Sequence, residues 1–239
     1  MTKIVWSKYP SNCSYINLQV SRITELNWEG APPGLEIVHL NFNNLTQFNW
    51  KGAPPDLKEI ELISNRLTHF NWKGCPLGLE RIDLDGNQLT QFNWEKCSSS
   101  LEKIYLTSNQ LTQFNWEHAP PGLKYIHLYG NKLTQFNFKN CPPGLKEIPL
   151  RYNKITTFNW EGCPNELEKV DLSHNNLTQF NWDHAPIGLK IIDLSHNHLT
   201  QFNWENCPKG LKGINLIGNK ITEINWDNVP SGLDRKSVV

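Results

Sequence analysis

Residues 34–50 read GLEIVHLNFNNLTQFNW, and this stretch decides the fold. Apolar and polar residues alternate around Val38, which is the period-2 pattern of a β-strand. Phe48 and Trp50 flank a single asparagine in the same alternation, and aromatic residues favour strands. The segment KGAPP that follows is too short and too rich in glycine and proline to form a helix. The stretch therefore predicts a short length of chain with two strands and no helix.

The same pattern returns at a constant step of 22 residues without insertion or deletion. An asparagine marks each step, at Asn43, Asn65, Asn87, Asn109, Asn131, Asn153, Asn175, Asn197 and Asn219. Self-similarity at such a period indicates a solenoid, in which each coil buries its apolar face only against its neighbours. We therefore predict a partial coil at residues 1–12, ten complete coils at residues 13–232 and a tail at residues 233–239.

The first half of each coil, L-x-x-L-x-L-x-x-N-x-L, resembles the leucine-rich repeat consensus, as in GLKYIHLYGNKLT at residues 122–134. The lead-in P-P-G-L-K-x-I is similar to that of bacterial secreted leucine-rich effectors, but F-N-W stands where those proteins carry L-P. The F-N core and the step of 22 residues resemble FNIP-type repeats, which are common in amoebae and their giant viruses. Such proteins often carry an F-box before the repeats. The chain has no room for one, so a ubiquitin-ligase adaptor role does not carry over.

The resemblance and the pattern together predict a leucine-rich repeat solenoid. We expect a mainly β, right-handed coil with parallel sheets on both walls and little or no α-helix. Stacked strands in such a fold lie about 4.8 Å apart.

Composition argues against several classes of function. Lys plus Arg equals Asp plus Glu, at 23 each, so the chain lacks the basic excess that binds nucleic acid. It contains no run of 18 apolar residues and no lipidation motif, so we expect no membrane association. The first residues have no long apolar segment of the kind found in signal peptides. We therefore expect a cytoplasmic protein, or a protein of the host cytoplasm or virion if it is viral.

Two asparagine columns follow the repeat, one through Asn43 and one through Asn49. An asparagine side chain carries both a donor and an acceptor, so it can satisfy backbone groups stranded in a turn and bond the next coil. A structural role is therefore expected for both columns. The alternative is a polar ligand-binding stripe along the stack. The tryptophan column through Trp50 is expected to be buried, with a partner for each indole N–H.

Five cysteines share one position of the coil, which holds Ala or Val elsewhere, and this indicates a small buried position: Cys75, Cys97, Cys141, Cys163 and Cys207. We expect free thiols there, because no export signal supports an oxidising compartment. Zinc binding by cysteine is not expected, because no Cys-x-x-Cys pair occurs. No cofactor is predicted.

The tetrapeptide DLSH occurs in two neighbouring coils and is the one constellation with a metal-binding reading. Its candidate ligands are Asp171, His174, Asp193 and His196. The alternative is two duplicated coils with solvated side chains. Nothing in the sequence supplies a catalytic nucleophile or pocket, so we expect no enzyme activity.

Recognition is expected at the positions that vary from coil to coil, on the strand of the concave sheet. Tyrosines gather there on successive coils, and tyrosine is a favoured interface anchor. The candidate partner-binding residues are Tyr105, Tyr125, His127, Tyr129, Tyr152, Glu61 and Asp83. The alternative is a decorated solvent face without a partner.

Two function classes remain open. The first is a protein–protein interaction scaffold. The second is a structural or self-assembling rod, such as a virion component. Open parallel edges invite pairing, and a solenoid end normally carries a polar cap. A homodimer through an uncapped end is therefore a further expectation.

Overall fold

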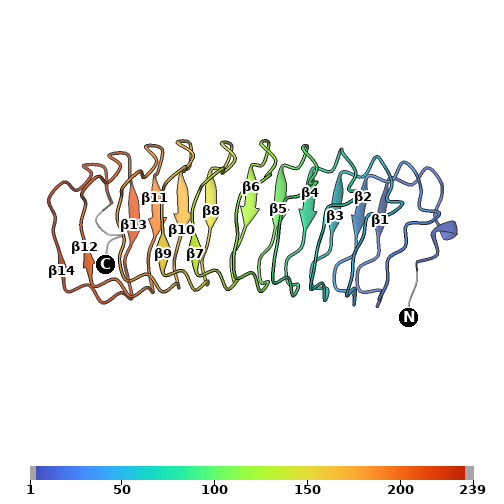
Figure 1. The fold of residues 1–239 in the computed structure, drawn as a ribbon, viewed down its shortest axis with the longest axis horizontal. Helices are drawn as coiled ribbons and strands as arrows, with labels where there is room; N and C mark the ends of the chain where they lie inside the picture. Colours follow the sequence, from blue (N-terminus) through green and yellow to red (C-terminus); the bar gives the residue numbers. More distant parts are fainter. Residues whose placement is uncertain (1–3, 235–239) are drawn as a thin grey trace. The chain divides into compact units, whose positions relative to one another are not determined.

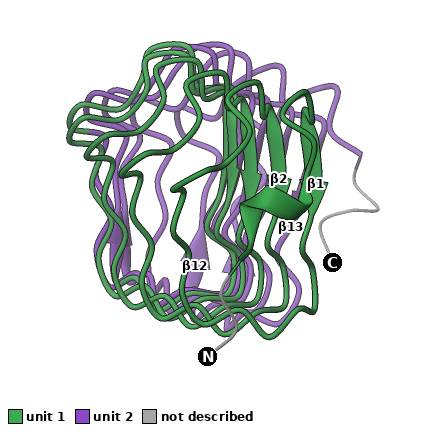
Figure 2. Ribbon diagram, turned by 90° about the vertical axis from the view of Figure 1, so that its right-hand side faces the viewer, with its two compact units in different colours: residues 1–111, 117–125 green, residues 112–116, 126–239 purple. Residues whose placement is uncertain are grey.

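A computed structural model describes residues 4–234. Part of the predicted partial coil, residues 1–3, and most of the predicted tail, residues 235–239, lie outside this range. The chain divides into two compact units. Unit 1 comprises residues 1–111 and 117–125, and unit 2 comprises residues 112–116 and 126–239 (Figure 2).

Unit 1 contains a short 3-10 helix followed by parallel strands that form one sheet in chain order (Figure 1). Its elements are η1 (Trp6–Lys8), β1 (Tyr15–Asn17), β2 (Ile37–His39), β3 (Glu59–Glu61), β4 (Arg81–Asp83) and β5 (Lys103–Tyr105). Strand β6 (Tyr125–His127) starts at the last residue of unit 1 and ends in unit 2. We call the side of the coil that carries these strands the first wall.

Unit 2 has strands on both walls, and Figure 2 shows β12 and β13 on opposite sides of the coil. Its first wall is a four-stranded parallel sheet in the order β13-β11-β10-β8: β8 (Glu147–Pro149), β10 (Lys169–Asp171), β11 (Ile191–Asp193) and β13 (Gly213–Asn215). Its second wall holds two pairs of two-residue strands: β7 (Gln135–Phe136) with β9 (Thr157–Phe158), and β12 (Gln201–Phe202) with β14 (Glu223–Ile224).

The paired strands join residues one repeat apart, as between Val38 and Ile60 or between Val170 and Ile192. The central residue of each first-wall strand points inward, and in β2 its exposed fraction is 0%. Flanking residues face outward because successive side chains of a strand point to opposite faces. The predicted parallel solenoid with almost no helix is thus confirmed for the described residues.

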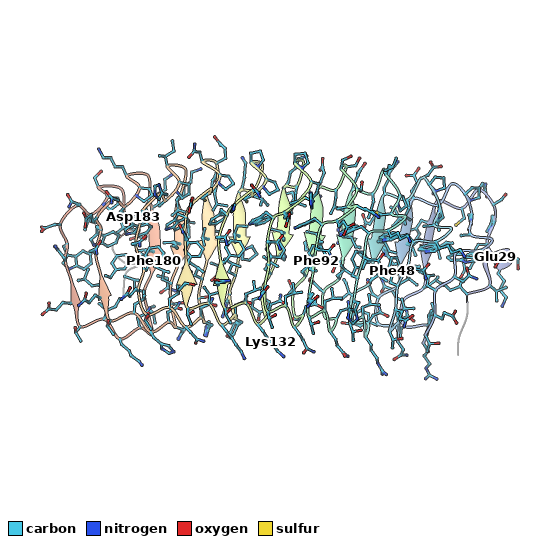
Figure 3. All side chains as sticks on the ribbon, in the orientation of Figure 1. Glu29, Phe48, Phe92, Lys132, Phe180 and Asp183 are labelled. Atoms are coloured by element: carbon cyan, nitrogen blue, oxygen red, sulfur yellow. The ribbon has the colours of Figure 1, made fainter. Side chains whose placement is uncertain are left out.

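Aromatic rings fill the half of the coil behind the second wall. Phe48 and Phe92 lie inside the coil, whereas Lys132 projects from the surface (Figure 3). Within unit 1, Phe48 packs edge-on against Trp50 with ring centroids 4.7 Å apart. From Trp28 to Trp204 the tryptophans are 1% exposed, as predicted, but Trp226 in the last coil is 50% exposed.

The second wall is less regular than predicted, because the described residues of unit 1 form no strand there. The tryptophan indoles account for this difference. Trp28 Nε1 donates to the backbone carbonyl of Asn49 at 3.0 Å, and Trp50 Nε1 donates to that of Asn71 at 3.0 Å. In a regular sheet, a backbone N–H of the neighbouring strand donates to such a carbonyl. Here the indole N–H donates to it instead.

The asparagine column through Asn43 connects successive coils, as predicted. Asn65 Oδ1 accepts a hydrogen bond from Leu45 N at 3.1 Å, and Asn65 Nδ2 donates to the carbonyls of Leu40 and Leu62 at 3.0 Å each. Asn65 is 6% exposed, so these bonds satisfy buried backbone groups.

No helix in residues 4–234 is both long and apolar enough to cross a bilayer.

Candidate functional site

Five charged or titratable side chains converge on the outer face of unit 1, and we call them the charge network: His39, Glu59, Glu61, Arg81 and Asp83. They come from β2, β3 and β4, where in-register pairing brings positions one repeat apart side by side. His39 pairs with Glu61, and Glu61 pairs with Asp83. The register of the solenoid therefore builds the network.

Arg81 holds the network together. Its Nη1 donates to Oε1 of Glu59 and, at 2.8 Å, to Oε1 of Glu61. Its Nη2 lies 3.5 Å from Oδ2 of Asp83. The guanidinium carbon also lies 5.2 Å from the centroid of the Tyr105 ring, within the range of a cation–π contact. One arginine thus contacts three carboxyl groups and one aromatic ring.

His39 is the member of the charge network that lies nearest to β1. Its Nε2 lies 3.6 Å from Glu59 Oε1, and its Nδ1 lies 3.6 Å from Glu61 Oε2. The ring packs edge-on against Tyr15, whose hydroxyl is 3.4 Å from Nδ1. Asn41 Nδ2 donates to Glu61 Oε2 at 2.7 Å. Polar neighbours on several strands thus fix the Glu61 carboxylate.

Burial and hydrogen bonding push two carboxyl groups in opposite directions. Burial acts to raise the pKa of Glu61, but hydrogen bonds from Arg81 and Asn41 outweigh it, so the net pKa is lowered. Burial raises the pKa of Asp83 to about 7, and the nearby Asp85 carboxylate adds to the rise. Asp83 is 5% exposed and its contact with Arg81 is long, so desolvation prevails over the ion pair.

A cavity of about 220 Å³ adjoins the network. Side chains from four successive coils line it: Glu36, Ile37, Lys58, Glu59, Glu80, Arg81, Glu102 and Lys103. Lys58 pairs with Glu36 at 2.9 Å, and these exposed partners contribute little to stability. The cavity wall therefore presents alternating charges of both signs beside the fixed Arg81.

The predicted tyrosine candidates divide between the two units. Tyr105 lies under Arg81, and Tyr125 is 51% exposed with Lys103 Nζ 5.4 Å from its ring centroid. In unit 2, Tyr129 and Tyr152 are 37% and 43% exposed, and their rings meet edge to face at 5.5 Å. His127 is exposed on β6. The tyrosine candidates within each unit are thus at its surface, and their binding role stays a prediction.

The DLSH pair forms a stack of rings in unit 2. His174 and His196 lie parallel with centroids 4.2 Å apart, and Tyr152 stacks on His174 at 4.1 Å. Burial lowers the pKa of His174, and the His196 ring and Arg151 lower it further.

The two aspartates of this pair are engaged in their own turns. Oδ1 of Asp171 accepts from the backbone N–H of Ser173 at 3.0 Å and from its hydroxyl at 2.6 Å, and Asp193 makes the equivalent bonds with Ser195. Within residues 4–234, three potential metal ligands come within 4.8 Å of one another only at His39, Glu59 and Glu61. The side chains of the DLSH pair are not that close together in the described residues, so metal binding by this pair stays a prediction.

The second asparagine column departs from the expectation that it bonds the next coil. Asn49 and Asn71 are exposed, and their Oδ1 atoms accept only local hydrogen bonds, from Lys51 N and Lys73 N at 3.1 Å each. Shallow polar grooves follow this column on the second wall, including one of about 640 Å³ that both asparagines line. This asparagine column therefore lies at the surface, and the side-chain hydrogen bonds of Asn49 and Asn71 stay within single turns.

The cysteine column is partly buried and its thiols are free. Burial raises the pKa of Cys75, Cys163 and Cys207 to about 12. A thiol held in its protonated form is a poor nucleophile and a poor metal ligand. The column therefore fills space in the coil.

Sequence reasoning named Glu61 and Asp83 but missed Arg81 and His39 as the residues that join them. The available signal was position. Arg81 occupies the same strand position as Glu59, and His39 occupies the same one as Glu61. Opposite charges at neighbouring positions of parallel strands interact across the sheet, as cross-strand pairs do.

Comparison with solved structures finds a similar fold in leucine-rich repeat domains. The APL1 leucine-rich repeat domain matches with a TM-score of 0.81 and 21% identity over 94% of this chain and 61% of that chain. The LRIM1/APL1C complex matches with a TM-score of 0.80 and 22% identity, over 91% and 42%. YopM from Yersinia enterocolitica WA-314 matches with a TM-score of 0.64 and 20% identity, over 89% and 48%.

This chain thus spans less than two thirds of the length of each of these structures. No family model and no curated protein matches it. At identities near 20%, the likeness concerns the fold. Together with the parallel sheets and the repeated coil, it shows that the chain has the fold of a leucine-rich repeat solenoid.

Proposed function

We propose that the chain is a non-enzymatic scaffold that binds a protein partner through the outward-facing residues of its first wall. The charge network is the observation that carries this proposal. It presents partly buried, oriented charges at positions that differ from coil to coil, whereas the core positions repeat. Solenoids commonly use such extended surfaces for binding.

The physical argument rests on Arg81 and Tyr105. Binding is weakened by the entropy lost when flexible side chains become ordered, and an arginine already held by two glutamates loses less of it. Arginine and tyrosine are also the residues most often found at the energetic centre of interfaces. One of the similar structures, LRIM1/APL1C, is a complex, which is consistent with protein binding by this fold.

The test begins with capture of a partner by the wild-type chain and proceeds to calorimetry with the purified partner. We expect Arg81→Ala/Tyr105→Ala to weaken binding at least tenfold, since each hot-spot truncation costs about 2 kcal/mol or more. Tyr125→Ala/Tyr129→Ala tests the other tyrosine candidates in the same assay.

The matched control changes the opposite wall. Gln47→Ala/Gln91→Ala alters two exposed residues of the second wall and leaves the first wall intact. If the control loses the partner while both first-wall variants retain it, the assignment to the first wall is wrong.

A self-assembling rod is the second candidate, and the exposed aromatic surface of the last coil favours it. Trp226 is 50% exposed and Ile217 is 49% exposed, whereas Trp204 in the preceding coil is 1% exposed. Contact with a second copy would remove this apolar surface from water. Light scattering across a concentration series tests the idea. A rise in mass that Trp226→Ser abolishes supports assembly, and a constant monomer mass refutes it.

We also infer from the F-N-W core that the repeats are of the FNIP type, with an origin in amoebae or their giant viruses and a location in the cytoplasm or virion. The spacing of 22 residues and the resemblance support this inference. Immunolocalisation in the source cells tests the location, and a secreted product would contradict it.

A further inference from the structure

His39 has a buried nitrogen without a hydrogen bond. Nε2 finds no partner in the described part of the chain, and its 3.6 Å separation from Glu59 Oε1 exceeds hydrogen-bond range. The other nitrogen, Nδ1, faces the Tyr15 hydroxyl at 3.4 Å and Glu61 Oε2 at 3.6 Å. A neutral imidazole that directs its Nδ1–H toward these oxygens keeps the Nε2 lone pair available for a ligand.

A histidine nitrogen and a glutamate oxygen stand close to the separation of two ligands on one metal ion, and a second glutamate lies nearby. One donor atom each of His39, Glu59 and Glu61 lies within 4.8 Å of the others. Two donors bound about 2.1 Å from one ion lie roughly 3.4 Å apart at a tetrahedral angle. The 3.6 Å between Nε2 and Glu59 Oε1 needs only a shift of a few tenths of an ångström to meet this geometry.

Charge and hydrogen bonding also suit a cation. The carboxyl groups of Glu59, Glu61 and Asp83 face the single guanidinium of Arg81. A carboxylate oxygen that accepts a hydrogen bond has a further lone pair, so Arg81 and Asn41 can orient the glutamates while an ion binds them. Ligating carboxylates are commonly held by such bonds.

We infer that His39, Glu59 and Glu61 form a binding site for a divalent first-row transition-metal ion of the Zn²⁺ class. The mixed imidazole and carboxylate donors select such ions over Mg²⁺, which prefers oxygen ligands alone. Three protein ligands leave a coordination position for water or for a donor atom of another molecule. The site is independent of the proposed scaffold function, because metal binding is measured without a protein partner.

Calorimetric titration of the full chain with Zn²⁺, paired with the visible absorption of bound Co²⁺, tests this inference. We expect one ion per chain at the site, with Mg²⁺ in excess failing to displace it. His39→Asn and the isosteric Glu59→Gln are each expected to weaken binding at least tenfold. Circular dichroism and thermal melting establish that each variant is folded, and either folded variant suffices.

Two further variants test whether the ion binds at these three residues. His127→Asn removes an exposed strand histidine of β6 and is expected to leave affinity unchanged. Arg81→Gln removes the guanidinium whose hydrogen bonds orient both glutamates, and it is expected to bind the ion more weakly than the wild type. Absence of binding, or equal affinity in the wild type and in both ligand variants, overturns the proposal.

Discussion

At the scale of single residues, the two asparagine columns show how one residue type serves two purposes. Asn65 is buried and bonded to two coils, whereas Asn71 is exposed and bonded within one turn. The difference in burial decides the energetic weight of each amide. A buried backbone group left without a partner costs about 1–3 kcal/mol, whereas an exposed group finds water.

The Asn65→Ala variant is therefore expected to destabilise the protein by about 2 kcal/mol, because the buried Leu45 N–H loses its acceptor. The carbonyls of Leu40 and Leu62 each lose one donor and keep a second, from Asn43 and Asn87. Asn71→Ala is the matched control and is expected to cost about 1 kcal/mol or less. Urea denaturation measures both. Equal costs would show that the buried bonds carry no special weight.

Asp83 is expected to make stability depend on pH. Its folded pKa of about 7 lies above the ordinary value of 3.8, so the folded state retains a proton that the unfolded chain has released. The free energy of unfolding therefore falls as pH rises from about 4 to about 7, by up to a few kcal/mol. Asp83→Asn should flatten this dependence and raise stability at pH 8. Urea midpoints of both proteins at several pH values provide the measurement, and parallel pH profiles would contradict it.

At the scale of elements, the turn at Gly162 limits what its own coil can accept, although other coils carry Lys96, His118 or Asn140 at the equivalent position. Gly162 has φ near +80°, and an added Cβ would lie 2.9 Å from the carbonyl oxygen of Phe138 in the coil before it. A side chain at this position would be strained by the positive φ, and it would clash with the backbone of the preceding coil. The glycine is thus required by the close stacking of two coils.

Gly162→Ala is expected to destabilise unit 2 by more than about 1 kcal/mol. Gly210→Ala serves as the control, because its nearest neighbour would be the carbonyl of Ile187 at 3.6 Å, an ordinary contact. Thermal melting followed by circular dichroism distinguishes the two. A melting temperature as low for Gly210→Ala as for Gly162→Ala would argue against the steric explanation.

The sequence predicts the elements better than the candidate site. Repetition identifies Val38 and Trp50 as core residues, and the structure buries both. The alternation that turns Phe48 inward also turns Asn49 outward, so the exposure of the second column was available from the same pattern. The place of Arg81 beside Glu59 was available from the register of the repeat. Its contacts with Glu61 and Asp83 were not, because they depend on the conformation of the arginine side chain.

At the scale of the whole molecule, successive first-wall strands within each unit pair residues that lie one repeat apart. The step of 22 residues keeps the paired strands in register. Stability in such an array is approximately a sum of coil and interface terms. The number of coils can therefore change without a change in the structure of any one coil.

Deletion of one full coil, residues 57–78, is expected to leave a folded protein, because residue 79 then continues the pattern that residue 57 began. Its far-UV circular dichroism should keep its shape, with a lower melting temperature from the lost interface. Deletion of half a coil is the control and should unfold unit 1, since it sends core residues to the surface. If the full-coil deletion also unfolds unit 1, the coils are not interchangeable.

The direction of the buried asparagine bonds has a consequence for the order of events during synthesis. Asn43 accepts a hydrogen bond from the backbone of Ile23, and Asn65 accepts one from Leu45, so each coil is completed by the coil made after it. The indole of Trp28 likewise donates to the carbonyl of Asn49. Because translation proceeds from the N-terminus, the newest coil on the ribosome always lacks its closing bonds. Folding of the nascent chain must therefore trail elongation by one coil.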